Sequence, residues 1–311
     1  MQVPTARGPM VLVATALALV CGCGGSSDTE SRDGSGTNEP APVIPVVAST
    51  NVYGDIVEQI GGGKVEVVSI ISDPAQDPHS FEASTQNRLA LAKAKVVVEN
   101  GGGYDDFVGR MLRSAKNSSP AVIDAVQVSG IAPKTGAELN EHVWYDFPAM
   151  GKLADRVADA LARSTPAGTD VFRNNAETFK EKLTVLESKE KRIKADHPDA
   201  AVAVTEPVPL YLTEASGLRN MTPADFSEAV EEGDDVAARS LQQTVALFTD
   251  KQVKALVYNE QTSGPQTEKV KRAAEDNGIP VVPVTETLPR GEDYIGWMTA
   301  NVDALKSALD R

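Results

Sequence analysis

The chain has 311 residues, 41% of them hydrophobic, which excludes wholesale disorder and predicts two lobes of about 100 to 150 residues each. Its 30 Lys and Arg against 44 Asp and Glu give a formal net charge of -14. Because phosphate binding needs a basic face, this charge argues against a nucleic-acid partner and favours a cation, although acidic surfaces most often only confer solubility.

The N-terminal segment is typical of a secretory signal followed by a tether. Residues 1–23 carry one positive charge and then an apolar run that is too short to span a bilayer. Cys23, which glycine precedes, resembles the lipidated cysteine of a bacterial lipobox better than Cys21, which valine precedes. Residues 24–42 are rich in Gly, Ser, Asp and Pro and predict a disordered tether. We therefore expect lipidation at Cys23 and a folded part anchored to the extracytoplasmic face of a cell membrane.

The stretch 43–165 alternates between strand and helix patterns and predicts an N-terminal lobe. Apolar, β-branched runs predict strands at 43–49, 65–71, 95–99 and 121–125. Helical spacing predicts helices at 52–60, 84–94, 104–116 and 149–164. This order is typical of parallel strands in a Rossmann-like arrangement. Glycines 101–103 carry neither a dinucleotide nor a Walker signature, so we interpret them as a strand-to-helix turn.

Two of the three histidines lie in polar loops of this lobe. The segment 77–82 reads Asp-Pro-His-Ser-Phe-Glu, so His79 follows the carboxyl end of a predicted strand, where open α/β sheets place ligands. The loop 130–141 leads to His142, which lies next to Trp144. Taken alone, His142 is explained equally well by packing against that tryptophan. Two neutral imidazoles in neighbouring loops of one lobe, however, could supply half of the ligands of a metal site.

One long helix is predicted between the lobes, within a connector at 166–198. Apolar residues recur at steps of three and four along 169–196, at Phe172, Ala176, Phe179, Leu183, Leu186 and Ile193. Such a helix would be about 40 Å long. We interpret His197 as a residue at its C-terminus, where an imidazole suits the helix dipole, and not as a ligand. A coiled-coil partner is the alternative use of this apolar stripe.

The stretch 199–311 repeats the alternation and predicts a C-terminal lobe. Strands are predicted at 201–205, 255–259 and 281–284, and helices at 209–216, 237–248, 266–277 and 294–309. Each strand leads into a carboxylate, at Glu206, Glu260 and Glu286. Because the carboxyl ends of parallel strands meet at one edge, we expect these carboxylates to converge on the edge facing the first lobe. The acidic run 228–235 we interpret as a solvated loop.

Four motifs of this chain together resemble those of a known family. They are the segment 77–82, Glu-His-Val-Trp at 141–144, Val-Thr-Glu at 204–206 and Thr-Glu-Thr-Leu at 285–288. They resemble the ligand motifs of the cluster A-I or TroA-like solute-binding proteins, the metal-binding lipoproteins of zinc and manganese ABC importers. The resemblance extends from residue 43 to the C-terminus.

The resemblance implies a fold, a site and partners. The fold is α/β, with two Rossmann-like βα lobes that have parallel sheets and are joined by one long rigid helix. A divalent metal is held between the lobes by His79, His142, Glu206 and Glu286. The cargo passes to an ABC permease and its ATPase, and we expect the carrier to be a monomer.

Two departures from the family's pattern bear on the metal. Glu286 stands where aspartate is commoner and is one methylene longer, and the histidine-rich loop of many zinc-specific members is missing between residues 130 and 141. Two oxygen ligands suit Mn²⁺, yet zinc generally binds a given site more tightly. The sequence therefore leaves Zn²⁺ or Mn²⁺ open as the transported ligand, and it leaves open whether Glu260 supports the ligands.

A metal-dependent hydrolase that uses the same residues is the alternative. Two histidines and two carboxylates with an open coordination position could activate water. The sequence has no His-Glu-x-x-His or Gly-x-Ser-x-Gly motif and no catalytic cysteine beside them, and a lipid tether suits a carrier. We therefore expect a carrier and not an enzyme.

Overall fold

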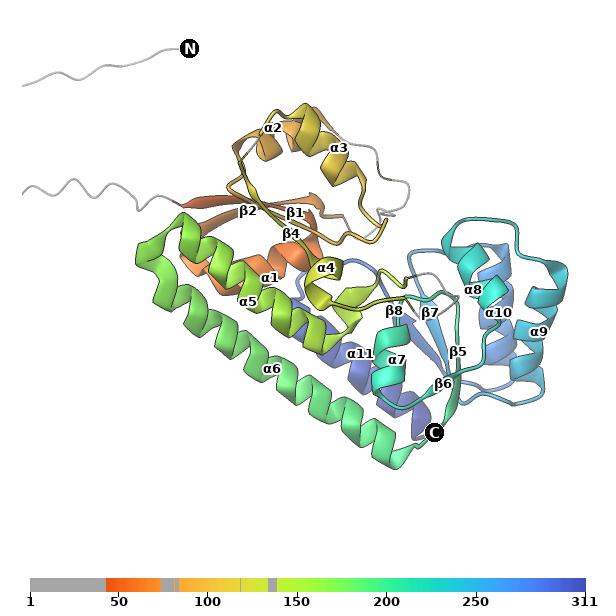
Figure 1. Ribbon diagram of the computed structural model, residues 1–311. Helices are drawn as coiled ribbons and strands as arrows, with labels where there is room; N and C mark the ends of the chain where they lie inside the picture. Colours follow the sequence, from red (N-terminus) through yellow and green to blue (C-terminus); the bar gives the residue numbers. More distant parts are fainter. Residues whose placement is uncertain (1–42, 74–80, 82–83, 118, 134–138) are drawn as a thin grey trace, which may run out of the picture. The chain divides into compact units, whose positions relative to one another are not determined.

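Two four-stranded parallel sheets form the framework of the protein (Figure 1). The computed structural model describes residues 43–73, 81, 84–117, 119–133 and 139–311. The first sheet has the order β2-β1-β3-β4, from β1 (Ile44–Thr50), β2 (Val65–Ile71), β3 (Val96–Glu99) and β4 (Ala121–Asp124). The second has the order β6-β5-β7-β8, from β5 (Ala201–Val204), β6 (Arg219–Asn220), β7 (Leu256–Asn259) and β8 (Val281–Val284). The predicted α/β fold with parallel sheets is confirmed.

Helices cover both faces of each sheet, as parallel strands require because both of their faces are apolar. Around the first sheet lie α1 (Asn51–Gly61), α2 (Thr85–Lys93), α3 (Phe107–Ser114), α4 (Ala125–Ser129) and α5 (Phe147–Ser164). Around the second lie α7 (Leu210–Ala215), α8 (Ala224–Glu231), α9 (Ala238–Thr249), α10 (Pro265–Asp276) and α11 (Tyr294–Leu309). In the first sheet α2 and α3 cover one face and α1 and α5 the other (Figure 1). Both faces of each sheet are therefore covered by helices.

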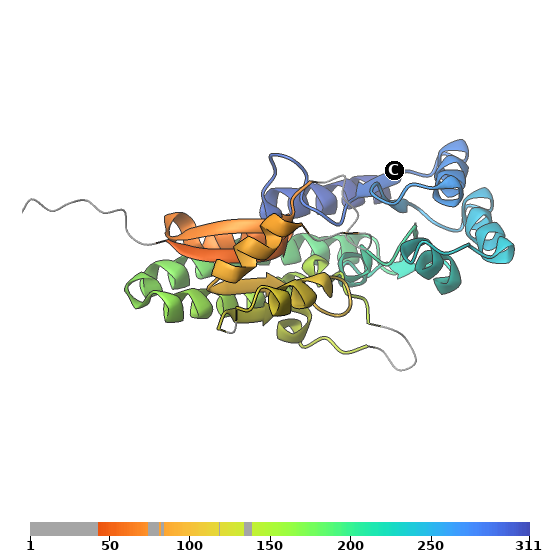
Figure 2. The same cartoon turned by 90° about the horizontal axis from the view of Figure 1, so that it is seen from above.

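The long helix α6 (Thr169–Asp196) connects the two sheets, as predicted. All six apolar residues of its expected stripe are buried. It packs along α5, α1 and α11, and the views in Figure 1 and Figure 2 both place α5 beside it. Its C-cap is His197, whose Nε2 lies 2.9 Å from Asp310 Oδ1. The interpretation of His197 as a helix-terminal residue is therefore confirmed.

The acidic run 228–235 is not entirely a loop, which corrects the prediction. Helix α8 ends at Glu231, so the first part of the run is helical. Phe226 and Val230 are buried and pack in the core beneath α9 and α10. Two apolar residues four apart are too few to produce a recognisable helical period. The expectation of a fully solvated run is therefore wrong at its helical end.

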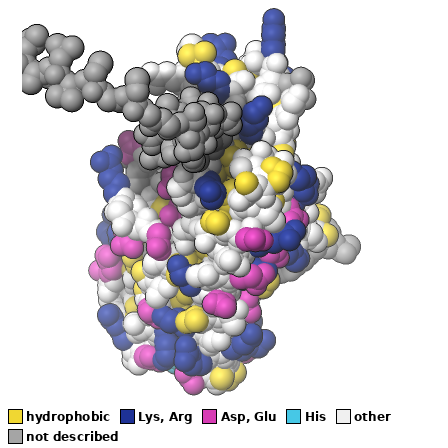
Figure 3. Space-filling model, turned by 90° about the vertical axis from the view of Figure 1, so that its left-hand side faces the viewer, with side chains coloured by type: hydrophobic (Ala, Val, Ile, Leu, Met, Phe, Trp, Pro, Cys, Tyr) yellow, Lys and Arg dark blue, Asp and Glu magenta, His cyan; other side chains and the backbone are white. Residues whose placement is uncertain are grey.

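The predictions for residues 1–42, including the signal, the tether and lipidation at Cys23, lie outside the described residues. Among the residues that the structure does describe, no helix is both long enough and apolar enough to cross a bilayer. On the face drawn in Figure 3, acidic and basic side chains are interspersed and hydrophobic ones are scattered. The negative charge is thus not gathered into one patch on that face.

Glu190 is a buried carboxyl group on the packed side of α6, where its side chain is 4% exposed. Burial raises the pKa of Glu190 to about 8, with smaller contributions from the charges of Glu187 and Asp146. Between pH 4.5 and about pH 8, the protonated form of Glu190 is therefore favoured in the folded protein, whereas an exposed glutamate is charged. The stability that this proton provides is fully present below the ordinary pKa of 4.5 and is lost as the pH rises towards 8.

Glu190→Gln is expected to raise the free energy of unfolding at about pH 8 by about 1–3 kcal/mol, because the variant cannot become charged in its buried position. The gain should be much smaller at about pH 5. Urea unfolding of the metal-free protein at both pH values measures it, with Glu181→Gln on the exposed side of α6 as the control. An equal effect at the two pH values would contradict the prediction.

Candidate metal centre

His142 is fully buried where the loop after α4 meets a short 3-10 helix at Val143–Tyr145. Its ring packs edge-on against Trp144 with centroids 5.0 Å apart, so the packing role considered from the sequence is also present. Its Nδ1 lies 2.7 Å from Asn140 Oδ1. The amide of Asn140 is oriented by its own Nδ2, which donates to the carbonyl of Pro207 at 3.0 Å. Because Oδ1 only accepts, Nδ1 carries the proton and the lone pair of neutral His142 lies on Nε2.

Two carboxylates from the second sheet's side lie close to this nitrogen. Glu231 Oε1, at the end of α8, is 3.2 Å from His142 Nε2. Glu286 Oε2, in the loop after β8, is 3.9 Å from the same atom. The Glu286 and Glu231 side chains are 2% and 13% exposed. Donor atoms from both sheets therefore meet around one point.

Asn259, the last residue of β7, holds two of the carboxylates together. Its Nδ2 donates to Glu206 Oε2 at 2.6 Å and to Glu286 Oε1 at 2.8 Å. Glu260, which we expected to converge here, is exposed. Successive side chains of a strand point to opposite sides, so at the end of β7 the inner position belongs to Asn259. Glu206 and Glu286 converge as predicted, and Glu260 does not.

The loop that carries Glu286 is fixed by bonds from both sheets. The hydroxyl of Tyr104, in the turn before α3, donates to Glu286 Oε2 at 3.2 Å. The hydroxyl of Tyr145 donates to the carbonyl of Thr285 at 2.8 Å. Gln261 Oε1 accepts from the backbone N–H of Thr287 at 3.0 Å. These contacts orient the carboxylate of Glu286 before any ligand arrives.

The negative charge at this point is concentrated. Burial, together with smaller contributions from the charges of Glu141, Glu206 and Glu286, raises the pKa of Glu231 to about 9. One donor atom each from Glu141, His142 and Glu231 lie within 4.8 Å of one another. A divalent cation is the species that would offset this repulsion and accept the lone pair of the imidazole.

Comparison with known proteins gives the family. The model of the family described as zinc-uptake complex component A periplasmic, ZnuA, matches residues 46–308. The chain belongs to the ZnuA family. The family resemblance predicted from the four motifs is thereby confirmed. The family is described as an uptake component, so the hydrolase alternative receives no support.

Several relatives match this ZnuA-family protein over most of its length. The manganese-binding lipoprotein MntA of Bacillus subtilis is 27% identical over 281 residues, which are 86% of this chain and 90% of the relative. The structure of the periplasmic zinc-binding protein TroA of Treponema pallidum has a TM-score of 0.72 and 21% identity, over 86% of this chain and 100% of that one. The solute-binding protein FpvC of Pseudomonas aeruginosa, in complex with Mn²⁺, also gives 0.72, at 22% identity over 86% and 98%. The two structures have the same fold as this chain.

The predicted ligands of this ZnuA-family protein fall into two groups. His142, Glu206 and Glu286 are described and lie in one buried network, whereas His79 lies outside the described residues. Sequence reasoning missed Glu231 and Asn259. Glu231 belongs to an acidic run, and it differs from the other acidic residues of that run by its place at the end of a helix whose Phe226 and Val230 are buried. Asn259 directly precedes Glu260, the carboxylate that the sequence suggests for this position.

Asn259→Leu is expected to lower the free energy of unfolding of the metal-free protein by about 1–3 kcal/mol, because Glu206 and Glu286 lose their shared donor. Urea unfolding with a chelator at about pH 7 measures the loss. Asn277→Ala, at the end of α10, removes an amide that donates to the Ala273 carbonyl at 2.8 Å and should cost less. Unchanged stability of Asn259→Leu would contradict a structural role for the amide.

Proposed function

We propose that the protein is the extracytoplasmic solute-binding component of an ABC importer. It captures a divalent metal, Zn²⁺ or Mn²⁺, between its two lobes and delivers it to a membrane permease driven by an ATPase. Membership of the ZnuA family supports the role of uptake component. The observation that carries the proposal is the approach of two carboxylates, the buried Glu286 and the half-buried Glu231, to the lone-pair nitrogen of His142.

The proposed ligands are His79, His142, Glu206 and Glu286. Two neutral imidazoles and two carboxylates balance the charge of a divalent cation, which limits the cost of burying it. The support for Glu206 and Glu286 is their burial and their shared donor Asn259, and the support for His142 is its burial beside Glu286, with Nε2 3.9 Å from Oε2. His142 also donates through Nδ1 to an amide oxygen, an arrangement typical of metal-bound histidine. The support for His79 is its place in the motif at 77–82.

The relatives bind both of the candidate metals. MntA is named for manganese and FpvC was determined with Mn²⁺, whereas TroA is named for zinc. The presence of carboxylate oxygens in the ligand set suits Mn²⁺, and the general order of affinities favours zinc. We therefore propose Zn²⁺ or Mn²⁺ as cargo, and the ligand set as the feature that determines the choice.

Replacement of a ligand by alanine is expected to weaken metal binding by at least the 10–100-fold that loss of a supporting residue typically costs. We expect this for His79→Ala, His142→Ala, Glu206→Ala and Glu286→Ala. Isothermal titration calorimetry with Zn²⁺ and Mn²⁺ measures it, and His197→Ala, at the end of α6, is the matched histidine control. Wild-type affinity in His142→Ala would refute the site.

We also propose that the mature protein is a lipid-anchored monomer, held at the membrane through Cys23 and the tether at 24–42. MntA of Bacillus subtilis and ScaA of Streptococcus gordonii are both named lipoproteins, which supports an anchor. The small residue before Cys23 supports the point of cleavage.

Cys23→Ser is expected to abolish the anchor, because the lipid is attached to the thiol. The protein should then move from the membrane fraction to the soluble or secreted fraction, and mass spectrometry of the wild-type N-terminus should find a lipidated Cys23. Cys21→Ser serves as the control and should leave the fractionation unchanged. An unmodified Cys23 in the mature protein would exclude this anchor.

A further inference from the structure

We propose that Glu231 is a further metal-binding residue and that it biases the site towards Mn²⁺ over Zn²⁺. The inference rests on the proposed function and extends it to the choice of cargo. It concerns a residue from an acidic run that would otherwise be interpreted as surface.

The distance between Glu231 and His142 fits two ligands of one cation. Two atoms bound to a metal at about 2.1 Å, with an angle of roughly 90 to 110° between them, lie about 3.0–3.4 Å apart. Glu231 Oε1 and His142 Nε2 are 3.2 Å apart, closer than Glu286 Oε2 at 3.9 Å. Glu231 is therefore at least as well placed as the predicted ligand Glu286.

The tautomer of His142 directs a lone pair at this point. Nδ1 donates to Asn140 Oδ1, so Nε2 of the neutral ring presents a lone pair. Facing it are the carboxylate oxygens of Glu231 and Glu286, which also present lone pairs. A proton shared between Glu231 and His142 can satisfy one pair of these atoms, whereas a divalent metal can contact all three.

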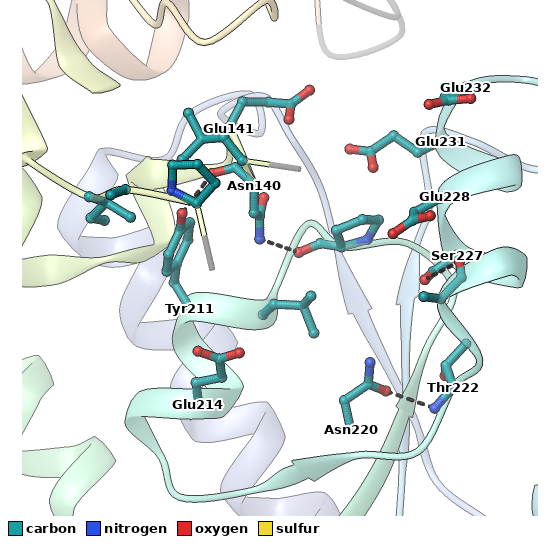
Figure 4. A pocket seen from close by; sticks show the side chains of 17 residues that line it. Asn140, Glu141, Tyr211, Glu214, Asn220, Thr222, Ser227, Glu228, Glu231 and Glu232 are labelled. Atoms are coloured by element: carbon teal, nitrogen blue, oxygen red, sulfur yellow. Dashed lines mark hydrogen bonds between the residues drawn. The ribbon is translucent and has the colours of Figure 1, made fainter. Parts of the chain in front are cut away.

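Glu231 differs from the other acidic residues of its run. Glu228 and Glu232 are exposed, whereas the Glu231 side chain is only 13% exposed. Figure 4 shows the carboxylate of Glu231 directed across the pocket towards the wall that carries Glu141 and Asn140. The burial of Phe226 and Val230 fixes α8 against its core and so sets this direction. One carboxylate of the run is thus placed at the site, and its neighbours provide matched controls.

A third carboxylate changes which metal the site prefers. Zinc is satisfied by four ligands in tetrahedral geometry, whereas Mn²⁺ favours more ligands and more oxygen. Glu206, Glu231 and Glu286 would place three carboxylates beside the imidazole of His142. Losing Glu231 should therefore cost Mn²⁺ more than Zn²⁺.

The experiment compares the full chain with Glu231→Gln, Glu232→Gln and His142→Ala by calorimetric titration with Mn²⁺ and with Zn²⁺ separately. We expect Glu231→Gln to weaken Mn²⁺ binding about 10–100-fold, Zn²⁺ binding by less, and Glu232→Gln to bind both metals as the wild type does. The absorption spectrum of the Co²⁺-loaded protein should become stronger in Glu231→Gln, as coordination falls towards tetrahedral.

Two results would overturn the inference. One is a Glu231→Gln variant that binds like Glu232→Gln with an unchanged Co²⁺ spectrum, which would make Glu231 a partner of His142 in the metal-free protein only. The other is an equal loss of affinity for both metals. If His142→Ala still binds like the wild type, the proposed function fails as well, so the two failures are distinguishable. Because glutamine has nearly the size of glutamate and carries no charge, Glu231→Gln should unfold no more easily than the wild type without metal.

Discussion

Like charge packed into a small buried space is the constraint on which this structure depends. Glu206 and Glu286 are almost inaccessible to water, and Glu231 joins them beside His142. Burying carboxylates is costly unless they are hydrogen-bonded or paired. The protein supplies an amide at Asn259 and a hydroxyl at Tyr104, which orient the oxygens without neutralising them. A divalent cation would relieve the remaining repulsion between the carboxylates. The free energy that this repulsion costs the metal-free protein would therefore add to its affinity for the metal.

The rest of the fold keeps these groups in place. Each carboxylate lies at or beyond the end of a short buried element, and the long helix α6 fixes the distance between the sheets from which they come. Hydrogen bonds of buried tyrosines cross between the sheets, from Tyr145 to Thr285 and from Tyr294 to Trp144. A site whose donors are held by packed elements pays little ordering entropy when the metal binds. For His142, Glu206 and Glu286, metal binding therefore depends on electrostatics more than on ordering of the side chains.

Under the proposal, the choice between Zn²⁺ and Mn²⁺ in this protein depends on the set of atoms that bind the metal. Relatives of this chain are named for manganese and for zinc on the same fold, so the fold does not decide the metal. For a given site, zinc binds more tightly than manganese, and a carrier can favour manganese only through geometry and ligand number. A carboxylate recruited from the surface run after Phe226 adds an oxygen donor without altering either sheet.

The sequence by itself determined the two parallel sheets, the length of α6 and the candidates His142, Glu206 and Glu286, because these follow from hydrophobic period and from local motifs. His79 remains a prediction from its motif. Only the tertiary structure decided which of two adjacent polar residues faces inward. Asn259 and not Glu260 bridges the carboxylates, and Glu231 and not Glu232 approaches the imidazole. Adjacent residues with similar chemistry are indistinguishable in a sequence, and the direction of a side chain is set by the packing of the strand or helix that carries it.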